Sequence, residues 1–226
     1  MEIEILSLFP SYFQGPFDVS MIGRAREKGL VTIRQIDIRD FAENRRKVDD
    51  RPYGGGPGMV LCPDPVAHAI RSVKRRNSRL IYLSPQGSLL TAAKCQELAS
   101  ADHLVILCGH YEGIDERVIE REGLEEISIG DYVLTSGCAA AVVLVDALSR
   151  FVPGVIGHPD AVKEDSFQDG IFDAPHYTGP VDFEGLEVPH VLRNGNHAEI
   201  AKWRKEKARI KTSRVRPDLL NGVCRE

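Results

Sequence analysis

Short clusters that mix glycine with polar and aromatic side chains follow three apolar segments of the chain. They are Leu83–Gly87, Cys108–Arg117 and Ile129–Gly137. Glycine-bearing turns at the carboxyl ends of parallel strands are the places where α/β proteins form ligand crevices. A single cluster of this kind is more often a tight turn that closes a short loop. Three of them together predict one shared pocket.

A fourth cluster, Val48–Met59, lies upstream and is the richest in glycine. Four glycines and two prolines fall within the eight residues from Pro52 to Met59, a composition that excludes a helix or a central strand. The alternative is a flexible loop, but flexible loops are usually rich in serine and lack the paired aspartates, Arg51 and Tyr53 found here. The cluster therefore favours a shaped loop that contacts a substrate.

Several common catalytic signatures are absent from the sequence. The first apolar segment leads into Leu8–Phe13 without a GxGxG turn, and the chain contains no GxxxxGK[ST], HExxH, CxxC or GxSxG pattern. A standard dinucleotide or nucleotide binder is therefore disfavoured.

The cysteines and the apolar stretches indicate a reduced, cytoplasmic setting. Five scattered cysteines never form a CxxC pair, which argues against a zinc site and a disulfide framework: they are residues 62, 95, 108, 138 and 224. The longest strongly apolar stretch, Cys138–Leu148, contains Asp146 and is too short to span a membrane. The acidic start of the chain is unlike a signal peptide.

Charge is distributed unevenly along the chain. The net charge is −4, yet residues 191–216 carry nine Lys or Arg against two Glu, a local balance of +7. A basic segment on an acidic body is typical of a protein that binds a polyanion such as a nucleic acid. The alternative is a solvated helix face without a partner.

The elements that must position these clusters alternate between apolar strands and helices. Five buried strands are expected: Ile3–Phe9, Val31–Ile38, Leu80–Leu83, Leu104–Cys108 and Glu126–Ile129. Four helices are expected: one that starts at Asp64-Pro65, Thr91–Ser100, Asp115–Glu122 and Gly137–Phe151. This alternation predicts an α/β domain with a largely parallel sheet.

A second domain is expected after a break in periodicity. Residues 1–152 form the α/β domain, residues 153–168 read as a polar linker, and residues 169–226 form a small helical domain. Asn196 and Glu199 have the spacing of a capping box that opens a helix with Ile200 and Trp203 on its apolar side. On that helix Lys202, Lys205 and Arg209 share one face.

Seven sequence motifs occur in the order found in bacterial tRNA (guanine-37-N1)-methyltransferases. They are DDRPYGGGPGM, YLSPQG, CGHYEGIDERV, SIGDYVL, SRFVPGVIGHPD, EDSF and GNHAEIAKWR. The chain resembles this family from Met1 to about Leu220. The family belongs to the SPOUT class of methyltransferases.

The resemblance implies a fold, a cofactor and an assembly. It implies an α/β domain whose C-terminal part forms a deep trefoil knot, a rare exception to the rule that proteins are not knotted. S-adenosylmethionine (AdoMet) is bound within the knot, and two chains form an obligate homodimer that shares its active sites. The implied cofactor-binding residues are Tyr82, Leu83, Ser84, Pro85, Gly109, Tyr111, Glu112, Gly113, Ser128, Ile129, Gly130, Asp131, Tyr132, Val133, Leu134 and Gly137.

The resemblance also assigns catalytic roles. Asp165 matches the general base that removes the N1 proton of guanosine 37, and Arg150 matches the cation that stabilises negative charge on guanine O6. Glu112 matches a residue near the target base that is linked to the family's Mg²⁺ dependence. The expected substrate contacts are Asp50, Tyr53, Gly55, Glu112, Ser166, Lys202, Lys205 and Arg209.

Two motifs depart from the family pattern. The family commonly continues DYVL with Gly-Gly-Glu and then Pro-Ala, whereas Thr135–Ala141 reads TSGCAAA. The family's YTRP appears as Tyr177–Pro180 with glycine in place of arginine. A non-catalytic RNA-binding protein with the same fold is therefore the main alternative, although such a protein would need neither Asp165 nor Arg150. An enzyme acting on a small molecule ranks last, because it leaves the basic segment without a purpose.

Overall fold

The computed structural model describes residues 1–157, 162 and 164–221, which fall into two compact units. Unit 1 covers Met1–Gly157 and unit 2 covers His158–Glu226. Part of the expected linker, the last five residues and the expected free thiol at Cys224 lie outside the described residues. Each unit is described by itself.

A parallel five-stranded sheet forms the centre of unit 1. Its strands are β1 (Glu2–Ser7), β2 (Thr32–Asp37), β5 (Arg79–Leu89), β6 (His103–Cys108) and β7 (Glu125–Ser128). Their spatial order is β2-β1-β6-β5-β7, and every neighbouring pair is parallel. The prediction of an α/β domain with a largely parallel sheet is confirmed.

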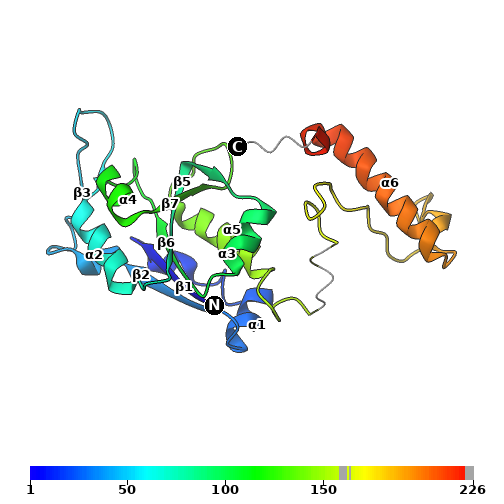
Figure 1. Ribbon diagram of the computed structural model, residues 1–226, viewed down its shortest axis with the longest axis horizontal. Coiled ribbons are helices and arrows are strands. Elements are labelled where there is room, and N and C mark those ends of the chain that lie inside the picture. The colour runs from blue at the N-terminus through cyan, green and yellow to red at the C-terminus, as the bar shows by residue number, and fades with distance from the viewer. Residues whose placement is uncertain (158–161, 163, 222–226) are drawn as a thin grey trace. The chain divides into compact units, whose positions relative to one another are not determined.

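Helices cover both faces of this sheet. They are α1 (Ser20–Glu27), α2 (Pro63–Val73), α3 (Ala92–Ala99), α4 (Glu116–Glu122) and α5 (Gly137–Ser149). Figure 1 shows α3 and α5 on one side of the strands and α2 and α4 on the other. Two buried apolar clusters result, one that includes α1, α3 and α5 and one that includes α2 and α4.

Two of the predicted helix starts are fixed by side-chain caps. Thr91 accepts a hydrogen bond from Lys94 N at 3.2 Å, and Asp115 accepts one from Arg117 N at 3.0 Å. Each bond satisfies a backbone donor that the first helical turn leaves unpaired. The helix expected at Asp64 begins one residue earlier, at Pro63.

The strand predicted to end at Leu83 continues to Leu89, so the expected turn at Leu83–Gly87 is part of β5. Pairing of β5 with β7 is interrupted between Leu83 and Ser88 and then resumes. Pro85 lies in this interruption, where its missing N–H costs no ladder hydrogen bond. A Cβ at Gly87 would overlap the backbone of Glu126 and Ile127, so the absence of a side chain lets the two strands approach.

Short elements complete unit 1. The 3₁₀ turns η1 (Pro10–Phe13) and η2 (Ile38–Phe41) follow β1 and β2. Strands β3 (Asp49–Asp50) and β4 (Val60–Leu61) pair as an antiparallel hairpin that encloses the glycine-rich loop. The described cysteines of the unit are free thiols, as expected.

Unit 2 contains one long helix, α6 (His197–Val215). Its other elements are the hairpin β8 (Asp182–Phe183) and β9 (Leu186–Glu187) and the 3₁₀ turns η3 (His190–Leu192) and η4 (Pro217–Asn221). The unit is therefore less helical than predicted. No described helix in either unit is both long and apolar enough to cross a membrane.

The start of α6 shows half of the expected capping box. Asn196 accepts from Glu199 N at 3.3 Å, as predicted. The Glu199 carboxylate, however, accepts from the side chain of Asn194 instead of Asn196 N. Asn196 N donates to the Asn194 side chain at 2.9 Å, so the asparagine two residues earlier takes the place of the glutamate.

Candidate active site

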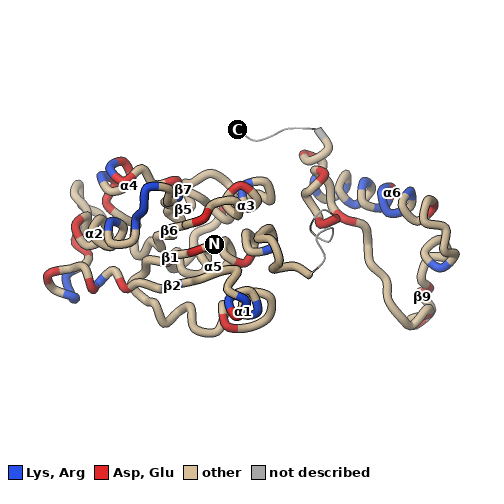
Figure 2. The backbone as a smooth tube through the Cα atoms, turned by 60° about the horizontal axis from the view of Figure 1, so that its bottom comes forward, with Lys and Arg blue, Asp and Glu red and all other residues tan. Residues whose placement is uncertain are grey.

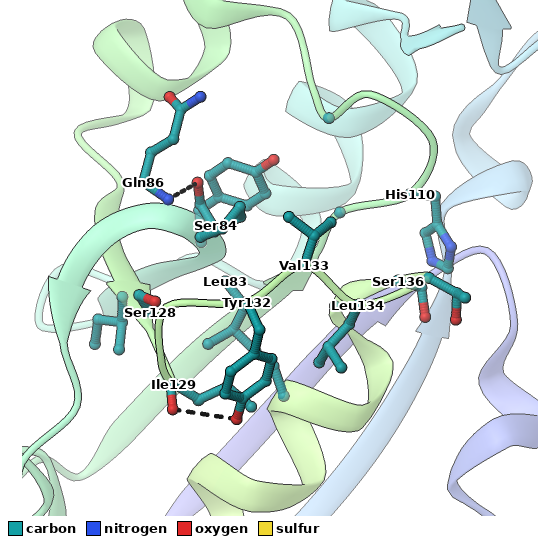
Figure 3. A pocket seen from close by; sticks show the side chains of 18 of the residues that line it. Leu83, Ser84, Gln86, His110, Ser128, Ile129, Tyr132, Val133, Leu134 and Ser136 are labelled. Atoms are coloured by element: carbon teal, nitrogen blue, oxygen red, sulfur yellow. Dashed lines mark hydrogen bonds between the residues drawn. The ribbon is translucent and has the colours of Figure 1, made fainter. Parts of the chain in front are cut away.

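The middle of β5, at its interruption, and the loops that follow β6 and β7 enclose a cavity of about 270 Å³ together with the first turn of α5. Fifteen of the sixteen expected cofactor-binding residues line it, and Asp131 does not. The close-up in Figure 3 shows labelled side chains from all three segments around it. Six further residues line it that were not named as cofactor contacts. Four of them lie inside the clusters predicted to share a pocket, namely Gln86, His110, Thr135 and Ser136, and two lie outside these clusters, namely Ile127 and Ala140.

Two glycines allow the backbone segments of the cavity wall to approach each other closely. Gly137 N donates to Gly109 O at 2.7 Å, and a Cβ at Gly137 would lie 2.9 Å from Gly109 N. A Cβ at Gly109 would lie 2.9 Å from the Tyr82 hydroxyl. Side chains at these positions would collide with the neighbouring segment, so glycine is what allows this close approach.

Hydrogen bonds within each loop hold the wall in shape. Gln86 N donates to Ser84 Oγ at 3.2 Å, and the Tyr132 hydroxyl donates to Ile129 O at 3.3 Å, as Figure 3 shows. Ser128 Oγ donates to Gly130 O at 3.0 Å. These contacts lie within the protein itself and restrict the conformations of the wall segments, which lowers the ordering cost of binding.

The departure from the family pattern at Ser136–Ala141 preserves the helix start. Ser136 accepts from Cys138 N at 3.3 Å and so caps α5, and Ala140 contributes to the cavity wall. The chain thus replaces a glycine with a capping side chain at this edge. The substitution leaves the backbone contact between Gly137 and Gly109 in place.

A buried thiol pair lies beneath the cavity. A hydrogen bond from Cys108 lowers the pKa of Cys138 to about 4, and a contact with Ser7 adds to this effect against the burial of the thiol. Burial raises the pKa of Cys108 well above its ordinary value. Burial also raises the pKa of the Tyr82 phenol, so this hydroxyl stays protonated and acts as a neutral group.

The glycine-rich hairpin loop is tied to the cavity wall. Glu112 N donates to Met59 O at 3.0 Å, and Leu61 N donates to Gly113 O at 3.0 Å. The expected substrate contacts Asp50, Tyr53 and Gly55 are exposed, and Tyr53 is 99% exposed at the loop tip. The structure therefore brings the loop to Glu112 without placing these three residues in the cavity.

Comparison with known proteins identifies the family of the chain that forms this cavity. Residues 1–222 match the family described as tRNA (Guanine-1)-methyltransferase TrmD. The chain belongs to this family. It is 64% identical to the tRNA (guanine-N(1)-)-methyltransferase of Protochlamydia amoebophila, over 97% of this chain and 100% of that protein.

Longer relatives carry the same name. Identity is 55% to the Chlamydia pneumoniae protein and 56% to that of Chlamydia trachomatis serovar D. The match covers 97% of this chain in each case, but only 61% and 62% of those relatives. The chain thus spans less than two thirds of the length of these two methyltransferases.

The two expected catalytic residues of the methyltransferase lie in different units. Arg150 forms the C-cap of α5 in unit 1 and is exposed. Asp165 is half-buried in unit 2, where it lines a second cavity of about 860 Å³. Lys205 and Arg209 of α6 line this cavity too, whereas Lys202 does not. All three residues lie on the continuous helix α6 at the spacing that was predicted to give them one face, but only Lys205 and Arg209 line this cavity.

Ser166, next to Asp165, belongs to a hydrogen-bonded group. Its hydroxyl donates to the Asp173 carboxylate and accepts from Asp173 N at 3.0 Å. His176 Nε2 lies 3.0 Å from the other oxygen of Asp173. The hydrogen bond from Ser166 lowers the pKa of Asp173, so this carboxylate is ionised at neutral pH and holds the segment around Asp165.

The described residues contain no cluster of three or more His, Cys, Asp and Glu that would hold a metal ion. Glu112 is the one acidic side chain among the described residues that line the unit 1 cavity.

Proposed function

We propose that the protein transfers a methyl group from AdoMet to N1 of guanosine 37 in tRNA. The observation that carries this proposal is one cavity in unit 1, which gathers the three segments that carry the family motifs around β5, β6 and β7. Fifteen of the residues expected to contact the cofactor surround it.

The cavity suits AdoMet because of what its wall consists of. Gly109 and Gly137 let the segments of the wall pack closely against each other and against Tyr82, and polar groups of the Ser84, Ser128 and Ser136 side chains line the cavity beside them. Tyr82, Leu83 and Leu134 add apolar surface. When bound, AdoMet supplies the electrophilic methyl group.

The acceptor nitrogen must lose a proton before it can be methylated at neutral pH. Guanine N1 carries a hydrogen and is a weak nucleophile, so a general base is required. The Asp165 carboxylate accepts this proton as N1 takes up the methyl group. As N1 loses its proton, negative charge develops on guanine O6, where the Arg150 guanidinium stabilises it until N1 takes the methyl group from the sulfonium of AdoMet.

The tRNA is held by the hairpin loop and by α6. Figure 2 shows basic residues along α6, and Lys202, Lys205 and Arg209 contact phosphates. Tyr53 offers a fully exposed ring to a nucleotide base. Ser166 contacts the target guanine base and helps to orient it.

Finer features of the family complete the proposal. The C-terminal part of unit 1 forms a deep trefoil knot, and two chains form a homodimer in which each site combines the cavity of one chain with Asp165 of the other. Mg²⁺ assists near Glu112 together with tRNA oxygens, since the described residues offer no dedicated cluster. The reaction takes place in the cytoplasm.

Transfer of labelled methyl from AdoMet to a tRNA transcript with guanosine 37 tests the activity. We expect transfer to this transcript and none to a matched transcript with adenosine 37. Binding of tRNA without transfer would instead support a non-catalytic RNA-binding protein. Transfer to both transcripts would reject the proposed position.

A further inference from the structure

Strand β6 has a buried histidine at each end. His103 is its first residue and is 3% exposed, and His110 follows its last residue by two positions and is 4% exposed. Only His110 lines the unit 1 cavity. The two side chains are therefore matched in type and burial but differ in their position relative to the cavity.

His110 joins the end of β1 to the cavity wall. Its Nε2 lies 3.4 Å from Leu8 N and 3.2 Å from Ser7 Oγ. Because a backbone N–H can only donate, Nε2 is the acceptor in the bond with Leu8, and in the neutral ring the proton resides on Nδ1. The Phe9 ring packs edge-on against the imidazole at 5.3 Å.

The same contact extends to the start of α5. Ser7 Oγ lies 3.1 Å from Cys138 Sγ and accepts from Phe9 N at 3.0 Å. His110 also pairs with Ser136 in an isolated β-bridge, and the two lie side by side in Figure 3. The imidazole thus links three segments: the end of β1, the loop after β6 and the first turn of α5.

The loop after β6 needs such an anchor because its backbone is strained. Tyr111 has φ of 58° and Gly113 has φ of 124°, and a non-glycine residue adopts positive φ only at a cost in free energy. His110 is the residue directly before Tyr111. An anchored imidazole therefore favours the loop conformation that forms the cavity wall.

We propose that His110 is a positioning residue that sets the affinity of the cavity for AdoMet. The proposal rests on the assignment of AdoMet to this cavity. His110 acts through the backbone of Gly109–Gly113, and it takes no part in proton transfer. Its loss should raise KM for AdoMet and leave kcat at saturating AdoMet and tRNA nearly unchanged, because binding weakens equally in the ground and transition states.

The experiment compares the two histidines in the full chain. His110→Leu should raise KM for AdoMet roughly tenfold through the lost hydrogen bond. His110→Gln, whose amide oxygen can accept from Leu8 N, should recover most of the affinity. His103→Leu is the matched control: it should lower the melting temperature and leave KM unchanged.

Two outcomes overturn the proposal. One is a His110→Leu variant with a lower melting temperature but an unchanged KM, since His110 would then be an ordinary core residue. The other is a comparable rise in KM in His103→Leu. If His110→Leu does not fold, Ser7→Ala replaces it in the comparison and should raise KM severalfold, and an unchanged KM there counts against the proposal.

Gly109→Val separates this inference from the assignment of the cofactor. If Gly109→Val and His110→Leu both leave KM for AdoMet unchanged, AdoMet does not bind in this cavity and the proposed site is wrong. If Gly109→Val abolishes binding and His110→Leu has no effect, the site stands and the role of His110 alone is rejected.

Discussion

The two units differ most in the number of side chains that they bury. Unit 1 has two apolar clusters, one on each face of its sheet. Among the described residues of unit 2, only Ala208 and Thr212 are buried, and both lie on α6. Unit 1 is therefore stabilised by its own core, whereas unit 2 relies more on individual hydrogen bonds, such as the one from Phe172 N to Thr212 Oγ1 at 2.9 Å that ties an extended segment to α6.

This contrast suggests a division of labour that experiments can test. A unit with a closed core can hold a preformed cofactor cavity, and a unit with an exposed helix suits a large polyanionic partner. Changes in unit 1 should therefore affect AdoMet binding, and changes in unit 2 should affect tRNA binding or turnover.

The largest effect is expected from Asp165→Asn. The amide keeps the size of the side chain but cannot accept a proton, so methyl transfer should fall roughly 10²–10⁴-fold. AdoMet affinity, measured by calorimetry, should not change because Asp165 belongs to unit 2. Near-normal turnover would remove Asp165 from the mechanism, and lost AdoMet binding would contradict the division between the units.

A mixed dimer tests whether the two units of one site come from different chains. Fourteen residues separate Arg150 from Asp165, and such a segment can extend up to about 50 Å. Asp165→Asn and Gly109→Val chains should each be inactive as homodimers. An equal mixture should regain roughly a quarter of wild-type activity if pairing is random.

Tagged co-purification must first verify that mixed dimers form. Verified heterodimers without activity above either parent would mean that each site lies within one chain.

A smaller effect is expected from the basic face of α6. Changing Lys202, Lys205 and Arg209 to Gln should weaken tRNA binding and flatten its dependence on salt by about 0.7–0.9 per lost phosphate contact. Lys202 does not line the unit 2 cavity. The single Lys202→Gln variant therefore tests whether the part of α6 outside this cavity contributes to tRNA binding. An unchanged slope in the triple variant would mean that this face has no role in tRNA binding.

The smallest effect concerns the pH dependence of unit 1. Burial opposes ionisation of Glu122, but hydrogen bonds from Lys74 and Arg71 lower its pKa below the ordinary 4.5. Because the folded pKa is depressed, the ion pairs stabilise the fold above pH 4.5, and this stability is lost as the pH falls through the folded pKa.

Glu122→Gln removes this contribution. Its melting temperature should be lower than that of wild type at pH 7, and the difference should shrink as the pH falls below 4.5, as followed by circular dichroism. AdoMet affinity at pH 7 should be unchanged. A melting difference that does not shrink with acidification would show that the ion pairs are not its cause.

Much of unit 1 could be predicted from the sequence because its signals are local. Apolar runs identified the five strands, and Thr91 and Asp115 are side chains whose capping chemistry defines a helix start. Helix α1 was missed because its N-cap, Val19, offers no side-chain acceptor. The extension of β5 was missed because it depends on a neighbouring strand, β7, which pairs with it again beyond Pro85.

The cavity was predicted as a shared site, but some of its members were not. His110 lies inside the predicted cluster Cys108–Arg117 but was not named as a cofactor contact, and only the fold brings it next to Ser7, about a hundred residues earlier in the chain. Asp131 lies inside a predicted loop and yet does not line the cavity. A loop motif indicates which segment contributes to a site without fixing the direction of each side chain.

The order of strands in the sheet has a consequence for how the chain folds. Strand β1 lies between β2 and β6, and Glu2 pairs with His103. During synthesis β1 therefore cannot pair with β6 until about half of the chain has been made. Loop closure over such a distance is entropically costly and slows folding. Until β6 arrives, β1 presents an apolar, unpaired edge of the kind that molecular chaperones protect from aggregation.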